Sequence, residues 1–278
     1  MFSSNPFVEL SSLIPPGIMQ GFVILMAVLV VAGTLFDVIH KKSARYFFEN
    51  MEAAKRRSVR QVSGGEKVSL AVQTAVSEVL TSSEFCNARR RVAHLLTMYG
   101  LVVHIVATIA LTFGYPATAD AGVWPLLWHL GALSVCVGGY WFWFFIRVDV
   151  AAEGGSPWRV VRADLFVLSL LASMTMALLW SWTQGSTLGW LCFVLYIGAS
   201  VVLFGGVPWS KFAHMFFKPA AAYQKKITKA DGSQENLPDV GDMADPEIQA
   251  RYPDIPTYMG EKPAYMGLGI KRETPNHY

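Results

Sequence analysis

Long apolar blocks alternate with polar segments along the chain, and five of the blocks have the length of a membrane span. A helix needs about 20 apolar residues to cross the hydrocarbon core of a bilayer. The blocks cover Gly17–Ile39, Val92–Tyr115, Val123–Ile146, Leu165–Trp182 and Leu188–Val207. Because lipid offers no partners to backbone N–H and C=O groups, each block is predicted to be a helix. The pattern therefore predicts an all-α membrane protein, a five-transmembrane-helix bundle.

The composition agrees with a membrane protein. Hydrophobic residues make up 53% of the 278 residues and charged residues 15%, against about 25% charged residues in a typical soluble domain. The first block is too long for a removed signal peptide and is not followed by a small-residue cleavage site. The fifth block is expected to continue as a helix past the bilayer, through Trp209 and His214, and to end before Pro219.

The basic residues predict the orientation of the helices. The N-terminal segment and the short loops Pro116–Gly122 and Thr183–Thr187 contain no Lys or Arg. The basic residues gather instead in three segments: 11 in Lys41–Arg91, 3 in Arg147–Arg162 and 9 from Lys211 onward. Positive residues stay on the cytoplasmic side of a membrane. We therefore expect a multi-pass protein of the bacterial inner (cytoplasmic) membrane, with the N-terminus outside and the C-terminus in the cytoplasm. Anchoring accounts for the net charge, which does not indicate nucleic acid.

The spans divide the chain into three predicted parts. These are a short external segment (1–16), a membrane domain (17–218) that includes a cytoplasmic loop (41–91), and a cytoplasmic tail (219–278). In the loop, Val68–Leu80 has apolar residues at helical spacing and is expected to lie on the membrane surface or against a partner. In the tail, Tyr258-Met259-Gly260 recurs as Tyr265-Met266-Gly267. Such apolar anchors predict a partner-docking tail; an unstructured tail is the alternative.

Histidines inside the spans are the main functional signal. His94 and His104 are ten residues apart in the second block, which places them about 15 Å apart along a helix and about 80° apart around it. His214 lies at the inner end of the fifth helix, level with His94. His129 lies roughly 9 Å below the outer surface, against about 16 Å for His104. An ionisable side chain inside a membrane costs a few kcal/mol unless it is matched by a partner.

Imidazoles from separate helices at matching depths are what a b-type haem requires. Neutral nitrogen ligands hold its iron axially, and an apolar bundle shelters the macrocycle. The alternative is that these histidines form hydrogen bonds to neighbouring helices. The cysteines Cys86, Cys136 and Cys192 have no CxxC spacing and therefore do not predict an iron–sulfur or zinc site.

Two sequence segments resemble those of known membrane subunits: FCNARRRVAHLLTMYG (Phe85–Gly100) and PWSKFAHMFFKPAAAYQKK (Pro208–Lys226). Together with the five-helix order and the pair His94/His104, they make the chain resemble the gamma subunit of respiratory nitrate reductase. The chain is more similar still to the membrane cytochrome b subunits of heterodisulfide reductase, the sulfite-reductase-associated complex and the quinone-interacting complex. Its length, its tail and its lack of a ferredoxin-like domain make it most similar to the membrane anchor of dissimilatory adenylylsulfate reductase. The resemblance covers roughly residues 17–226.

This resemblance implies roles for particular residues. His94 and His214 match the ligands of a haem near the cytoplasm, and His104 matches one ligand of a distal haem. The family's second distal ligand, eighteen positions before His214, falls on Tyr196. Three interpretations remain: the distal haem is absent, His129 replaces the missing ligand, or His104, His129 and Tyr196 line a quinone pocket. The implied cofactor is haem b, one or two per chain.

The implied function is an electron-transfer subunit. It would carry electrons between the quinone pool and a cytoplasmic iron–sulfur flavoenzyme, which the resemblance implies is the alpha and beta subunits of adenylylsulfate reductase. Alternatively, it would be the equivalent subunit of another quinone oxidoreductase complex of sulfur metabolism. One rival is a haem-free anchor with a quinone site. Another is a small transporter, for which inverted repeats or charged residues within the spans would be typical; the sequence shows neither. The expected partners are lipid, quinone and the soluble enzyme.

Overall fold

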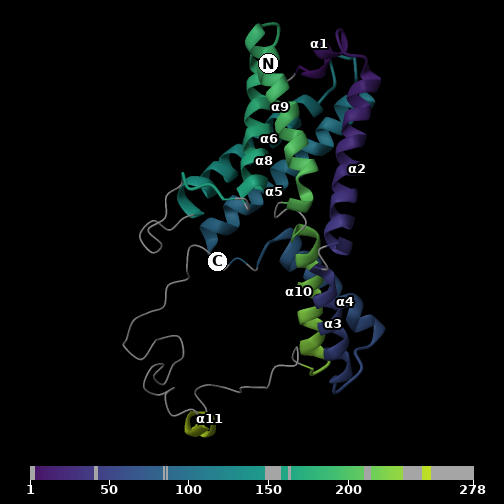
Figure 1. Ribbon diagram of the computed structural model, residues 1–278, viewed down its shortest axis with the longest axis vertical. Helices are drawn as coiled ribbons and strands as arrows, with labels where there is room; N and C mark the ends of the chain where they lie inside the picture. Colours follow the sequence, from purple (N-terminus) through teal and green to yellow (C-terminus); the bar gives the residue numbers. More distant parts are fainter. Residues whose placement is uncertain are drawn as a thin grey trace.

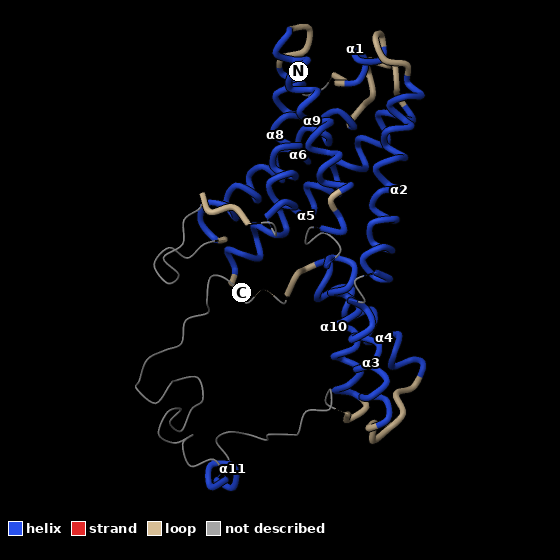
Figure 2. The backbone as a smooth tube through the Cα atoms, viewed as in Figure 1, coloured by secondary structure: helices blue, strands red, loops and turns tan. Residues whose placement is uncertain are grey.

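The structure is a computed structural model of the chain and describes most of its residues. The described ranges are 4–40, 43–83, 85, 87–147, 158–161, 164–209, 214–233 and 246–251. At 43, 44, 46, 214–216, 248, 249 and 251 only the backbone is described. Cys86 and the repeated Tyr-Met-Gly motif of the tail lie outside these residues. Within the described ranges, every regular element is helical (Figures 1 and 2).

The helices follow one another in a simple order. They are α1 (Phe7–Ser11), α2 (Pro16–His40), α3 (Ser43–Arg56), α4 (Gly64–Thr74), η1 (Ala75–Leu80), α5 (Ala88–Ile109), η2 (Ala110–Gly114), α6 (Trp124–Trp141), η3 (Phe142–Ile146), α8 (Leu165–Trp182), α9 (Thr187–Gly205), η5 (Val207–Trp209), α10 (His214–Ala230) and α11 (Pro246–Arg251). Three of the η segments, η1 to η3, are π-helical turns that extend the helix before them.

Five of the described helices are long and apolar enough to cross a membrane: α2, α5 with η2, α6 with η3, α8 and α9. They coincide with the five predicted blocks and end within a turn of the predicted boundaries. The prediction of an all-helical, multi-pass membrane protein is therefore confirmed.

Each span packs against its neighbour, so the bundle forms an almost closed ring. Helix α5 lies along α6, α6 contacts α8, α8 lies along α9, and α9 contacts α2. Helix α2 is the least buried of the five spans. Apolar side chains such as Ile24, Val28 and Leu35 are exposed on α2, as expected for residues that face lipid.

The N-terminal segment closes one end of the bundle. The side-chain amide of Asn5 donates hydrogen bonds to the carbonyl oxygens of Tyr115 (2.7 Å) and Thr118 (3.1 Å). The amide of Gln184 donates to the carbonyl oxygen of Pro6 (2.6 Å). The three segments that lack Lys and Arg therefore meet at the same end of the molecule.

Close contact between α5 and α6 depends on glycine. A Cβ added to Gly131 would lie 2.7 Å from the backbone nitrogen of His104, and one added to Gly138 would lie 2.6 Å from the carbonyl oxygen of Ala93. Both clashes involve backbone atoms, which a rotamer change cannot relieve. Small residues allow membrane helices to approach this closely. The tight α5–α6 contact therefore sets the position of His104.

We expect Gly131→Ala to destabilise the bundle. The added methyl group overpacks the α5–α6 contact and costs about 1–3 kcal/mol, so the melting temperature in detergent falls. The matched control is Gly198→Ala on α9, because nothing lies within 4 Å of a Cβ at that position. Equal melting temperatures for the two variants would contradict the proposed role of the close contact.

A helical module lies at the opposite end of the bundle. It comprises α3, α4, η1 and α10 (residues 43–83 and 214–233), which lie beyond the end of α2 in Figure 1. Helix α10 contacts α3, α4 and η1. The helix predicted at Val68–Leu80 is confirmed as most of α4 with η1, whereas α3 was not predicted.

The predicted end of the fifth helix is wrong in two respects. Helix α9 ends at Gly205, and the turn that follows requires glycine at 206, because a Cβ there would lie 2.4 Å from the carbonyl oxygen of Val202. A new helix, α10, then begins at His214 and continues through Pro219 to Ala230. A proline inside a helix removes one hydrogen bond. Contacts with α3 and α4 support α10 despite this loss.

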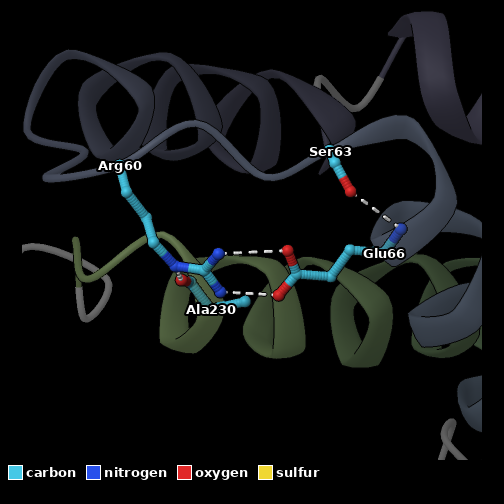
Figure 3. A network of polar contacts seen from close by, with 4 residues as sticks. All are labelled: Arg60, Ser63, Glu66 and Ala230. Carbon is cyan, nitrogen blue, oxygen red and sulfur yellow. Dashed lines mark hydrogen bonds and ion pairs between the residues drawn. The ribbon is translucent and has the colours of Figure 1, made fainter.

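A polar network joins the start of α4 to the end of α10 (Figure 3). The Ser63 hydroxyl caps α4 by accepting a hydrogen bond from the backbone N–H of Glu66 (3.2 Å). The Arg60 guanidinium donates two hydrogen bonds to the Glu66 carboxylate (2.6 and 3.1 Å) and one to the carbonyl oxygen of Ala230 (2.6 Å). The hydrogen bond from Arg60 lowers the pKa of Glu66 below its usual value. The network fixes how the two helices of the module meet.

Candidate functional site

Among the described residues, one ring nitrogen of His104 has no hydrogen-bond partner although it lies deep in the bundle. Only 2% of the residue is exposed. Its Nδ1 lies 2.9 Å from the carbonyl oxygen of Trp128 on α6. Since a carbonyl oxygen can only accept, Nδ1 carries the proton and Nε2 keeps its lone pair. Nε2 is buried and has no hydrogen-bond partner among the described residues.

Such an arrangement is typical of a metal-ligating histidine. Buried polar atoms are almost always hydrogen-bonded, so an exception calls for an explanation. Histidines that bind a metal through one nitrogen commonly donate the other N–H to a backbone carbonyl, which holds the ring and its tautomer. The bond from His104 to Trp128 has this form. Haem iron is therefore a partner that the chemistry of His104 Nε2 fits.

His129 is also buried, with 3% exposed, but both of its nitrogens are engaged. Nδ1 donates to the carbonyl oxygen of Pro125 on the same helix (2.6 Å), and Nε2 accepts from the Ser181 hydroxyl on α8 (2.7 Å). For His129 to bind a metal, the Ser181 hydroxyl would have to turn away. As it stands, His129 joins α6 to α8.

The rings of His104 and His129 both contact one indole, that of Trp128. The ring centroids lie 4.8 Å and 4.9 Å from it, respectively. Trp128 is fully buried, and its indole N–H donates to the Thr108 hydroxyl (3.1 Å). Because the α5 and α6 backbones also touch between Gly131 and His104, no macrocycle fits between these two helices at this depth.

Next to this contact is an aromatic interior that includes Trp128 and to which three further helices contribute. Ala107, one turn after His104, belongs to a buried cluster with Met19 of α2, Trp180 of α8 and Tyr196 of α9. The Tyr196 ring stacks on Trp180 at a centroid distance of 6.0 Å and an interplanar angle of 16°. The structure thus brings Tyr196 into the same interior as the residues next to His104.

His94 lies at the start of α5, at the end of the bundle that carries the module. Its side chain is exposed, and its ring lies 4.9 Å from the Phe85 ring. The Lys218 ammonium on α10 lies 5.5 Å from the same Phe85 ring. His214 is one turn before Lys218 and therefore on the same face of α10. The His214 side chain itself lies outside the described residues. The structure thus brings together the helix ends that carry His94 and His214.

Several contacts of this region were not predicted from the sequence. The carbonyl of Trp128, the Ser181 hydroxyl and the Trp180–Tyr196 stack all join different helices. Their formation depends on how the helices rotate in the bundle, which no local pattern encodes. The glycines of α6 are a local signal for its close contact with α5, since small residues indicate close packing of membrane helices.

Comparisons with known proteins give one partial similarity. The chain is 28% identical over 154 residues to the citrate utilization protein B of Escherichia coli. The similarity covers 53% of this chain and 40% of that protein, so the chain spans less than half of its relative's length. No family model and no solved structure matches the chain.

Proposed function

We propose that the chain is a haem-b membrane anchor subunit that transfers electrons between a quinone pool and a cytoplasmic iron–sulfur flavoenzyme. Adenylylsulfate reductase is the partner that the resemblance of the histidine-bearing segments favours. The observation that carries the proposal is the buried Nε2 of His104, whose ring is oriented by the Trp128 carbonyl and which lacks a partner among the described residues. Bound haem b would supply single-electron transfer.

The residues that would hold the cofactor come from both ends of α5. His104 offers its buried Nε2, and its neighbours Ala107 and Trp128 belong to the cluster that also contains Tyr196. His94 and His214 would hold a second haem at the module end, where Phe85 contacts both α5 and α10. His129 either holds its helix against Ser181 or exchanges protons with a quinol near the outer surface. Tyr196 would form part of that quinone pocket.

The positions of the basic residues support the proposed orientation. Asn5, Gln184 and the loop after Tyr115 meet at one end, and the segments that they belong to contain no Lys or Arg. The helical module at the other end carries ten Lys and Arg residues. By the positive-inside rule, the module faces the cytoplasm of a bacterial cell and the N-terminus lies outside.

An absorption spectrum of the purified protein tests the cofactor. We expect a reduced α band at the b-haem position and one or two haems per chain by the pyridine haemochrome assay. Adding a quinol to the oxidised protein should make this band appear, because the haem is proposed to accept electrons from quinol. A purified, folded protein without the band would instead be the haem-free anchor.

The similarity to the E. coli protein favours a second candidate partner. That relative is named for citrate utilization, so the same electron-transfer role could serve an enzyme of tricarboxylate metabolism. Membranes that contain the chain and its soluble partner separate the two cases. Quinone reduction driven by sulfite and AMP supports adenylylsulfate reductase, and quinone reduction driven by a tricarboxylate supports the alternative.

A further inference from the structure

An apolar stripe is exposed along α4 and η1. It consists of Val68, Val72, Val76 and Leu80, which follow one another at intervals of four residues. Their exposed fractions are 64%, 58%, 49% and 51%. The opposite side of the same helix contacts α10, where the Lys226 ammonium donates to the Ser77 hydroxyl (2.9 Å). We call these four residues the valine stripe. A stripe of this spacing is typical of a helix that docks into an apolar groove.

The direction of the valine stripe favours a protein over the membrane surface. Its first residue follows the Arg60–Glu66 network, which is attached to Ala230 at the far end of α10. Its last residue, Leu80, accepts a hydrogen bond from the Tyr99 hydroxyl on the span α5 (2.6 Å). The stripe therefore runs from the far end of the module back to the bundle (Figure 1). A helix that lies on a bilayer would instead follow the membrane plane.

The charge of the module indicates what kind of protein fits. Its described residues, 43–83 and 214–233, contain ten Lys and Arg against five Asp and Glu, an excess of five positive charges. Most of these positive charges lie on α3 and α10, whereas α4 with η1 carries Lys67 against Glu66 and Glu78. Two copies of the chain that met here would still bring two modules of the same net charge together. An acidic surface is complementary and would also speed association.

The stripe leads directly to His94, near the start of α5. Thr81, the residue after the stripe, accepts a hydrogen bond from the guanidinium of Arg91 on α5 (2.7 Å). His94 is one turn further along α5, and its ring contacts Phe85 (4.9 Å between centroids). A protein seated on the stripe would therefore lie next to His94, where electrons would enter or leave.

We propose that the valine stripe is the docking face for a water-soluble protein with an acidic surface and an apolar groove. The proposal rests on the proposed function only in expecting this partner to be the iron–sulfur flavoenzyme. It places docking on α4 and η1, apart from the tail that the sequence favoured.

A photo-crosslinking amino acid at position 72, in the full-length protein in its own cells, tests the proposal. Position 59 is the matched control, because Val59 belongs to the same module and is 83% exposed but lies off the stripe, next to Gly232. We expect a crosslink from position 72, and none from position 59, to one soluble acidic protein. With that partner purified, the double variant Val72→Glu/Val76→Glu should bind at least about tenfold more weakly, because glutamates repel an acidic surface and do not fill an apolar groove. Val59→Glu should bind as the unchanged protein does.

Other outcomes overturn the docking face. In the crosslinking experiment, these outcomes are no crosslink from position 72, or a crosslink to lipid, to a second copy or to the chain's own acidic segment 234–245. In the binding experiment, the outcome is unchanged binding by the glutamate variant. An unchanged melting temperature shows that the glutamate variant is folded, as expected for exposed positions. The two proposals fail separately: an acidic partner without flavin and iron–sulfur clusters leaves the docking face standing and contradicts the proposed function.

Discussion

Replacing His104 by alanine is expected to remove about one haem per chain, because an axial imidazole is the main bond that the chain offers to the iron. The assignment follows from the geometry of His104, whose Nδ1 is bound to the Trp128 carbonyl while Nε2 has no partner among the described residues. Two measurements report the loss: the haem-to-protein ratio, and the rate at which a quinol reduces the haem, followed by the α band. We expect the rate of haem reduction by quinol to fall at least about 100-fold. Even residues that only orient a metal ligand lower metal affinity or activity 10- to 100-fold when they are changed.

His104→Met distinguishes ligation from a structural role. Methionine is also a ligand of haem iron and raises its reduction potential relative to histidine. We therefore expect the methionine variant to keep the haem with a shifted potential and a changed spectrum. His40→Ala is the control, because the His40 ring stacks on Phe36 at the end of α2, away from the site. Unchanged haem content and potential in both His104 variants would contradict the ligand assignment.

The same assay on His129→Ala separates the interpretations that the sequence leaves open. Both nitrogens of His129 are hydrogen-bonded, to Pro125 and to Ser181. If this network persists in the protein with its cofactor, the variant keeps its haem. Loss of the haem would show that Ser181 turns away and that His129 supplies the missing distal ligand.

The membrane fold was predictable from the sequence because it depends on local properties. Length and apolarity alone define a span, and the five predicted blocks agree with the five apolar helices. The segments outside the spans were harder to predict. Helix α3 is short and amphipathic, and α10 persists through Pro219 because α3 and α4 pack against it. Contacts with distant parts of the chain decide such cases.

The candidate site was predictable only in part. Helical rise places His104 and His129 at similar depths, but depth does not say which way a ring nitrogen points. The bond from His104 to Trp128 and the bond between His129 and Ser181 depend on how α5, α6 and α8 are rotated against one another. These bonds make His104 the stronger ligand candidate, a distinction that the sequence did not make.

The second large effect concerns the other end of α5, where His94→Ala and His214→Ala are expected to remove the same haem. The Phe85 ring contacts both His94 and Lys218 of α10, and His214 is one turn before Lys218. Two ligands of one iron act as a unit, so their effects are not additive. The double variant should therefore lose no more haem than either single variant, by the same pyridine haemochrome assay.

Combining His94→Ala with His104→Ala tests whether the two ends of α5 serve separate haems. The two histidines are ten residues apart, which is about 15 Å along the helix and too far for both to bind one iron. We therefore expect each single variant to keep a reduced α band and the combined variant to have none, with His40→Ala again as the control. The assignment would fail if His94→Ala and His214→Ala left different haems behind. A single haem lost completely in both His94→Ala and His104→Ala would mean that one of the two residues acts indirectly, through the position of α5.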